Sequence, residues 1–132
     1  MATLLKTSRE YIDFDFAFTK HPISKNLAVK KGINAVKQSI THLLTLKEGD
    51  KPFHPEIKSP VYQYLFENAS MITQVVLEDE IYRYLTVYEP RMKIIKVTIS
   101  FPNPNAISCD VYGEIVNVTE PFNVNILINR LR

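Results

Sequence analysis

The sequence has little of the residues on which several classes of protein depend. Its 132 residues contain one cysteine, three glycines and no tryptophan. A single cysteine, Cys109, cannot form an internal disulfide, so a fold held together by disulfide bonds is not expected. Three glycines leave no glycine-rich loop to cradle a phosphate group. No apolar run approaches the roughly 20 residues of a membrane-spanning helix, and the first residues lack the pattern of an export signal. We therefore expect a soluble protein made in the cytoplasm, with no membrane partner.

Residues that could perform catalysis or bind a metal are few and scattered. His21, His42 and His54 lie far apart in the chain, without the spacing of a helical metal motif and without a second cysteine. Cys109 falls on the apolar face of a predicted strand, which favours a small core residue over a nucleophile. The sequence thus predicts no catalytic residue, no metal, no cofactor and no small-molecule substrate.

Carboxylates are available, and they leave one enzymatic alternative open. A glycoside hydrolase needs two of them roughly 5–9.5 Å apart across a cleft. The sequence does not exclude such a pair among Glu56, Glu67 and Glu89, although no pattern of saccharide-binding aromatic residues accompanies them. Arg91, two residues from Glu89, would keep that carboxylate ionised and unsuitable as a general acid.

The net charge of +2 is too small to indicate a nucleic-acid partner, but the charge is unevenly distributed. Residues 20–58 contain eight basic side chains and three acidic ones, whereas residues 67–89 contain five acidic side chains and one basic one. One interpretation is a pair of solvated faces. The other is a subunit that docks oppositely charged neighbours on different sides.

The first part of the chain alternates like a strand. From Ile12 to Phe18 every second residue is isoleucine or phenylalanine, the period of a half-buried strand or extended arm. Pro22 ends this pattern, because proline lacks the N–H group that a strand ladder uses.

Three later segments, residues 32–45, 60–66 and 74–88, are predicted to be helical. The first carries apolar residues at helical spacing and is expected to end near Gly49, which can adopt the left-handed conformation. Pro60 suits the first turn of the second helix. The third is expected to have Thr73 as its N-cap and to end before Pro90.

Two expectations concern shorter segments of this helical part. The acidic residues 78–80 lie in the first half of the third predicted helix, where they would complement its dipole. Phe53, held between two prolines in a loop, is expected to pin that loop onto the core.

After Arg91 the hydrophobic period changes from helical to two. Three predicted strands each have one apolar face: Ile95, Val97, Ile99 and Phe101; Ile107, Cys109, Val111, Gly113 and Ile115; and Val124, Ile126 and Ile128. Turns are expected at residues 102–105 and 119–122. The fold class is therefore α+β, a single domain over residues 1–132. It comprises an extended arm (1–28), a helical part (29–90) and a three-stranded antiparallel meander (91–132), to which the arm could add a strand.

Several segments resemble the baseplate wedge and sheath-initiator family of contractile tails. The most specific is Glu89-Pro90-Arg91, at the end of an acidic helix and just before a strand. Further matches occur in the family's order along the chain: Asp13-Phe14-Asp15-Phe16, His21-Pro22, Lys37-Gln38-Ser39-Ile40, Leu43-Leu44, Gly49, Pro52-Phe53-His54-Pro55-Glu56 and Leu65-Phe66-Glu67-Asn68. Two positions depart from the family pattern: Lys58 replaces a common glycine, which puts the local backbone path in question, and Asn26 replaces a common acidic residue.

The resemblance implies a structural role in the virion tail, assembled in the host cytoplasm. Glu89, Pro90 and Arg91 would contact the core bundle formed by other wedge subunits, with Pro90 fixing the spacing of one anion and one planar cation. The meander would resemble the interlocking domain of the tail sheath protein. The edge of its last strand would accept sheath strands along Asn123, Val124, Asn125, Ile126, Leu127 and Ile128. Tail-tube initiator proteins are a further expected partner, and nucleic acid is not.

Three alternatives remain at this point. The Glu-Pro-Arg segment could be only a helix stop with a local ion pair. The protein could be a peptidoglycan-degrading, lysozyme-like tail enzyme that uses Glu67 or Glu89. A bacterial regulator of related fold that binds a protein partner is the third.

Overall fold

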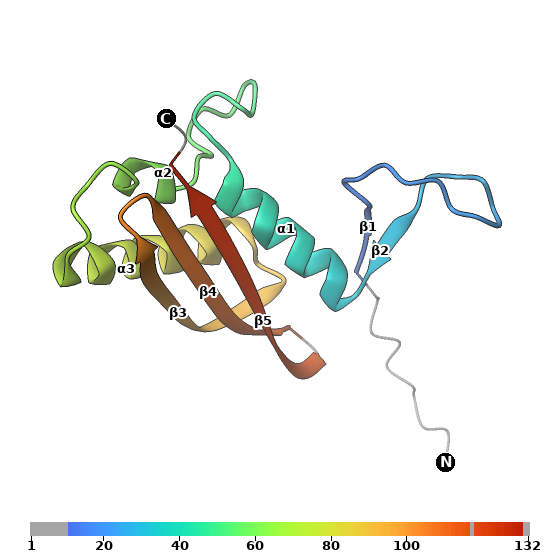
Figure 1. Ribbon diagram of the computed structural model, residues 1–132. Helices are drawn as coiled ribbons and strands as arrows, with labels where there is room; N and C mark the ends of the chain where they lie inside the picture. Colours follow the sequence, from blue (N-terminus) through green and yellow to red (C-terminus); the bar gives the residue numbers. More distant parts are fainter. Residues whose placement is uncertain (1–10, 117, 131–132) are drawn as a thin grey trace, which may run out of the picture.

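The computed structural model describes residues 11–116 and 118–130, without the side chains of Val118 and Thr119. Its elements are β1 (Ile12–Phe14), β2 (Val29–Lys31), α1 (Ile33–Thr45), α2 (Val61–Tyr64), α3 (Met71–Tyr88), β3 (Met92–Asn103), β4 (Ala106–Ile115) and β5 (Val118–Asn129). Figure 1 shows α1 and α3 packed around the sheet formed by β3, β4 and β5, with β1 and β2 projecting away from it. No helix in these ranges is long and apolar enough to cross a membrane.

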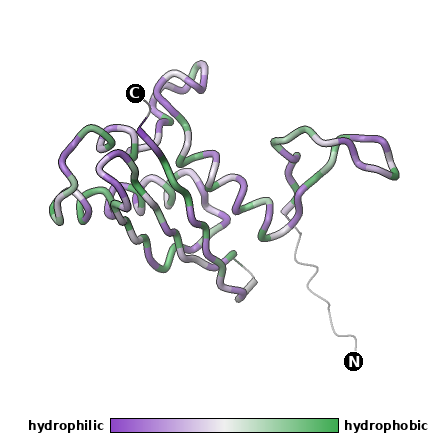
Figure 2. Tube along the Cα trace, viewed as in Figure 1, coloured by the Kyte–Doolittle hydropathy of each residue, from purple (hydrophilic) through white to green (hydrophobic). Residues whose placement is uncertain are grey.

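The sheet is an antiparallel meander with strand order β3-β4-β5, which confirms the predicted α+β class. One face is covered by the helices, and the alternating residues of β4 and β5 that point towards them are buried. Figure 2 shows the matching alternation of hydrophobic and hydrophilic residues along these strands. The core therefore lies between this face and the two long helices.

Helix α1 forms where the periodicity predicted it. Val36, Ile40 and Leu44 are completely buried, while the polar side of the helix faces solvent. Helix α1 ends at Thr45, and Gly49 adopts its left-handed conformation (φ 84°) in the loop that follows.

The loop after α1 contradicts the prediction for Phe53. This side chain is 97% exposed, at a residue with φ of 68°, and it packs on nothing in the core. The loop is instead closed at its ends, where the Ser59 N–H donates to the Leu46 carbonyl at 2.9 Å. The prediction was wrong because Phe53 lies in solvent, and a backbone hydrogen bond closes the loop in place of an apolar anchor.

Helix α3 begins earlier than predicted. Its N-cap is Ser70, whose Oγ accepts from the N–H of Thr73 at 3.1 Å, so Thr73 lies inside the first turn. The buried stripe of Leu77, Ile81 and Leu85 is as expected. The first turn holds no acidic residue, so residues 78–80 are too far along the helix to act on its N-terminal dipole.

The three acidic residues have separate partners instead. Glu78 accepts a hydrogen bond from the N–H of Ile99 in β3 at 3.0 Å. Asp79 pairs with Arg83 at 2.8 Å on the exposed side of the helix, and Glu80 accepts from the hydroxyl of Tyr64 at 2.8 Å.

Two irregularities of the sheet differ from the simple alternation. A shift of register between Ile94 and Lys96 buries Ile94 (8% exposed) and leaves Ile95 outside (57% exposed), so the predicted inward orientation of Ile95 is wrong. Such a bulge inserts one extra residue and reverses the faces on one side of it. The predicted turn at residues 119–122 is also wrong, because these residues belong to β5, where Pro121 pairs with Glu114.

The N-terminal arm does not join the main sheet. Strands β1 and β2 form their own two-stranded antiparallel sheet, in which Asp13 pairs with Lys30. Ile12, Phe14 and Phe18 are 59%, 61% and 73% exposed, so the apolar face predicted to be half-buried is largely in solvent. The arm in the structure comprises residues 11–31.

Candidate docking surfaces

The end of α3 positions Glu89 and Arg91. Glu89 caps the helix, with its N–H bonded to the Leu85 carbonyl at 2.8 Å, and β3 begins at Met92. Nε of Arg91 donates to Oε1 of Glu89 at 2.7 Å, and its Nη2 donates to Oε2 at 2.9 Å. The planar fork thus binds the carboxylate through both oxygens, the strongest geometry for such a pair.

Glu89 is ionised although its side chain is only 2% exposed. Burial by itself would raise the pKa of this carboxyl, but hydrogen bonds from Arg91 and Ser39 outweigh burial, and the pKa lies below its ordinary value. The pKa of Arg91 is raised, chiefly by the hydrogen bond to Glu89. A carboxyl held in its ionised form is a poor general acid, as the sequence predicted.

The two charged residues of the motif are therefore not equally accessible. Glu89 is internal and satisfied, which corrects the expectation that it offers a free anion to a partner. Pro90 is exposed, and the Arg91 side chain is 26% exposed. The guanidinium also lies 5.6 Å from the centre of the Tyr11 ring, within the range of a cation–π contact. Surface recognition at this motif would depend on Pro90 and Arg91.

The outer edge of β5 is the second predicted docking surface. Val124, Ile126 and Ile128 point into the core, whereas Asn123, Asn125 and Leu127 point to solvent. The register with β4 is regular from Asn129 back to Pro121. Across the ranges that the structure describes, no hydrogen bond from outside β4 reaches the β5 backbone at residues 123–128.

The opposite edge, on β3, is protected. The Ile99 N–H, in the middle of that strand, is occupied by the carboxylate of Glu78. Register shifts interrupt β3 on both sides, between Ile94 and Lys96 and between Ser100 and Asn103. Bulges and covering side chains are common ways of blocking an edge strand. The two edges of the sheet thus differ: the register of β5 is regular over residues 121–129, whereas that of β3 is interrupted on both sides of the residue that Glu78 covers.

Glu67 and Glu89, two of the carboxylates considered for hydrolysis, do not come together. Glu67 precedes α3 and Glu89 follows it, and an 18-residue helix is about 27 Å long, far more than the separation that glycoside hydrolysis needs. Glu56 is exposed and lies 3.0 Å from Nδ1 of His54. The groove between the arm and α1, of about 510 Å³, contains one carboxylate, Asp15, which bonds to the Thr19 hydroxyl.

The histidines have local roles. Nδ1 of His21 accepts from the N–H groups of Ile23 and Ser24, and the His42 ring meets the Phe16 ring edge-on at 4.9 Å. No group of three potential ligands that could hold a metal exists among residues 11–116 and 118–130.

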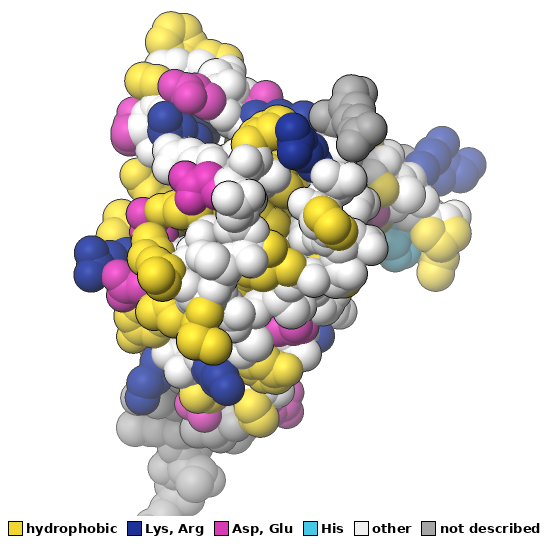
Figure 3. Space-filling model, turned by 60° about the vertical axis from the view of Figure 1, so that its left-hand side comes forward, with side chains coloured by type: hydrophobic (Ala, Val, Ile, Leu, Met, Phe, Trp, Pro, Cys, Tyr) yellow, Lys and Arg dark blue, Asp and Glu magenta, His cyan; other side chains and the backbone are white. Residues whose placement is uncertain are grey.

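Sequence reasoning missed two features of the surface. Tyr11, Gln38 and Ser39 contact the arm or the Glu-Pro-Arg motif, and no periodicity or spacing marked them for that role. The solvent side of α3 is also strongly apolar, and Figure 3 shows hydrophobic side chains scattered over one face of the molecule. The exposed residues of α3 include Met71, Ile72, Val75, Val76 and Val87.

Comparison with known proteins places these features in context. The model of a family described as baseplate wedge protein gp25 matches residues 30–119. The baseplate wedge protein gp25 of Enterobacteria phage T4 is 29% identical over 76 residues, a match that spans only 58% of the length of either chain.

Two solved structures share the fold. A candidate tail lysozyme from Geobacter sulfurreducens has a TM-score of 0.66 and 19% identity, with 74% of this chain and 90% of that one covered. A chain from the baseplate of the anti-feeding prophage has a TM-score of 0.63 and 15% identity, with 93% and 88% covered.

Proposed function

This chain belongs to the family of baseplate wedge protein gp25, and from that premise we propose that it is a structural subunit of a contractile-tail baseplate. It would reside in the virion tail and associate with other wedge subunits, the tail sheath protein and tail-tube initiator proteins. The observation that carries the proposal is the family match over residues 30–119, a segment that includes the Glu-Pro-Arg motif and most of the sheet.

The first proposed contact is between Arg91 and the core bundle of the wedge. Arg91 is partly exposed beside the exposed Pro90, so an acidic or aromatic group of a partner could reach the free side of the guanidinium. Glu89 supports this contact indirectly, because it holds the guanidinium in one orientation through two hydrogen bonds.

The second proposed contact is the addition of sheath strands to β5. Its regular outer edge at residues 123–128 offers backbone groups to an incoming strand, while Glu78 and the bulges block the β3 edge. A sheet extended at one defined edge would give the first sheath ring its register, as in the interlocking domain of the sheath protein.

The docking proposal is tested by neutralising the ion pair without leaving a buried charge. We expect the double variant Glu89→Gln/Arg91→Gln to fold, but wedges that contain it should not assemble. The variant should therefore not restore tail formation in a phage that lacks its own copy of this protein. The matched control is Asp79→Asn/Arg83→Gln, which neutralises an exposed pair on α3. Normal assembly of sheathed tails with the Glu89/Arg91 double variant would contradict the docking role.

The strand-addition proposal is tested by a cryo-EM map of the intact tail. We expect backbone density from a neighbouring chain along residues 123–128 of β5, at the roughly 4.8 Å spacing of paired strands. An empty β5 edge in assembled tails would remove this model.

The alternative of a peptidoglycan-degrading enzyme makes a different prediction. Purified protein that clears peptidoglycan, and loses this activity in Glu67→Gln or Glu89→Gln, would favour it. The separation of these two residues by the length of α3 argues against it.

A further inference from the structure

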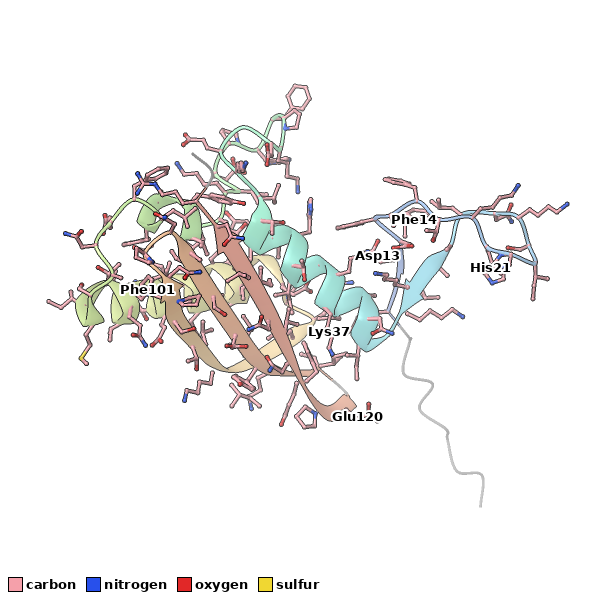
Figure 4. The ribbon with its side chains drawn as sticks, viewed as in Figure 1. Asp13, Phe14, His21, Lys37, Phe101 and Glu120 are labelled. Atoms are coloured by element: carbon pink, nitrogen blue, oxygen red, sulfur yellow. The ribbon has the colours of Figure 1, made fainter. Side chains whose placement is uncertain are left out.

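Three segments that are distant in the sequence meet where the arm joins the body. They are residues 11–16 of the arm, residues 38–42 of α1 and the Glu89–Arg91 pair after α3. Figure 1 shows the rest of the arm extending away from the main sheet, and Figure 4 shows Asp13 and Phe14 on the side of the arm nearest α1. The direction of the arm therefore depends on a small set of contacts at its root.

Gln38 makes the first of these contacts. Its Nε2 donates to the Phe14 carbonyl at 2.6 Å, and its Oε1 accepts from the Phe16 N–H at 3.1 Å. A side-chain amide that bonds a carbonyl and an N–H two residues apart imitates a neighbouring strand. His42, one turn further along α1, adds its edge-on contact with the Phe16 ring.

Arg91 makes the second contact. Its guanidinium, already held by Glu89, lies over the Tyr11 ring, and the Asp13 carboxylate contributes favourable charge nearby. The Tyr11 carbonyl also accepts from the Gly32 N–H at 2.7 Å. Gly32 is the N-cap of α1 and has φ 58° and ψ −128°, a conformation open essentially only to glycine. The chain thus turns sharply from β2 into α1 next to the ring that Arg91 covers.

We propose that the Glu89–Arg91 pair is a latch that sets the direction of the arm, so that docking at Arg91 and the orientation of the arm are coupled. One face of the guanidinium packs on Tyr11 in the free subunit. A partner that draws Arg91 away from Tyr11 leaves the arm attached through Gln38, His42 and the Gly32 turn alone. The exposed Phe18 and Ile23 of the arm would then change position relative to the sheet. The identity of that partner rests on the proposed function, whereas the latch is a property of the isolated protein.

The test measures the spread of arm positions in the isolated full-length protein. Spin labels are placed at Ile23→Cys, near the tip of the arm, and at Lys96→Cys, on the open face of the sheet; both positions are exposed and the native Cys109 is buried. Double electron–electron resonance then gives the distribution of distances between them. We expect Tyr11→Leu and Glu89→Gln/Arg91→Gln each to make this distribution about twofold wider, because each removes the latch.

A matched control removes another cation–π contact. Arg130 lies 4.4 Å from the centre of the Phe66 ring, which is outside the arm, so Phe66→Leu should leave the distribution unchanged. Gln38→Ala provides a second variant, which should widen the distribution with the Arg91 contact intact. A distribution as narrow in Tyr11→Leu and the double variant as in the parent would overturn the latch. Failure of the docking proposal would give a different result. In that case the double variant would show a wider distance distribution and would still assemble tails normally.

Discussion

At the scale of single residues, Glu89 and Arg91 form the one charged pair in the described chain whose carboxylate is almost wholly buried. Removing both charges of such a pair often changes stability little, because the cost of desolvation disappears with the attraction. Removing Arg91 alone is different, since it leaves an unpaired carboxylate in the interior. The pair therefore specifies one local arrangement of α3, β3 and the arm.

This difference predicts how stability depends on pH. The folded-state pKa of Glu89 lies below its ordinary value, so its stabilising contribution is present above that ordinary value and is lost as the pH falls through the folded-state pKa. We expect Arg91→Gln to lower the free energy of unfolding by about 3 kcal/mol at pH 7. The deficit should shrink towards pH 4, because burial without Arg91 raises the pKa of Glu89 and protonation then removes the unpaired charge.

Urea unfolding at pH 7, 5 and 4 measures both effects. The double variant Glu89→Gln/Arg91→Gln is the control and should stay within about 1 kcal/mol of the parent at pH 7. An Arg91→Gln deficit that is constant with pH would show that the Glu89 carboxylate is not the group left unpaired.

At the scale of elements, α3 connects the proposed docking residues to the sheet. Its buried stripe packs on β3, Tyr84 donates to the Leu43 carbonyl of α1 at 3.0 Å, and Glu78 covers the edge of β3. The helix that ends at Glu89 thus also covers the β3 edge of the sheet. The start of this helix, at the Ser70 cap, is a place where its stability can be tested separately.

Ser70→Ala should cost about 1 kcal/mol of unfolding free energy, because it removes the acceptor for the Thr73 N–H. Thr73→Val is the matched variant: it keeps the N–H and the β-branched shape, and we expect a smaller loss. Equilibrium urea unfolding compares the two variants. A larger loss in Thr73→Val than in Ser70→Ala would mean that the hydrogen bonds of the Thr73 hydroxyl to the Asn68 carbonyl and to Ser70 Oγ stabilise this end of the helix more than the Ser70 cap does.

At the scale of the whole molecule, the meander and its two long helices form one core, and the arm lies outside it. The centre of that core is β4, which has a neighbour on each side and carries the fully buried Cys109 and Val111. Burial raises the pKa of the Cys109 thiol from 9.0 to about 12, with smaller contributions from nearby carboxylates. The reactive thiolate is therefore scarce in the folded state.

This placement makes Cys109 a probe of global unfolding. At pH 8 the folded protein should react with iodoacetamide at least about a thousandfold more slowly than the urea-unfolded chain, because both ionisation and access are suppressed. The labelling rate should rise with urea in parallel with loss of the sheet signal in circular dichroism. Rapid labelling while the sheet is intact would mean that β4 opens locally.

Most of the α+β body could be predicted from the sequence, because helical and strand periods each mark one apolar face. The stripe of α1 and the faces of β4 and β5 are buried as their patterns indicated. The same rule failed for Ile95, where a bulge changes the face without altering the composition of the strand. The ion pair between Glu89 and Arg91 could be anticipated from their two-residue spacing. The burial of the Glu89 carboxylate could not.

The order and type of the main elements, and the family-specific segments that they carry, follow from the pattern of residues along the chain. Which apolar faces are covered depends on the packing of the folded chain: the α1 stripe is buried, whereas Phe53 and the alternating face of the arm are in solvent. The same packing pairs the Glu89 carboxylate with Arg91, places Glu78 at one edge of the sheet, and brings Tyr11 and Gln38 into the contacts that hold the arm. The physical reason is that a hydrophobic period specifies which side of an element avoids water, while only packing between distant segments supplies the surface that covers it.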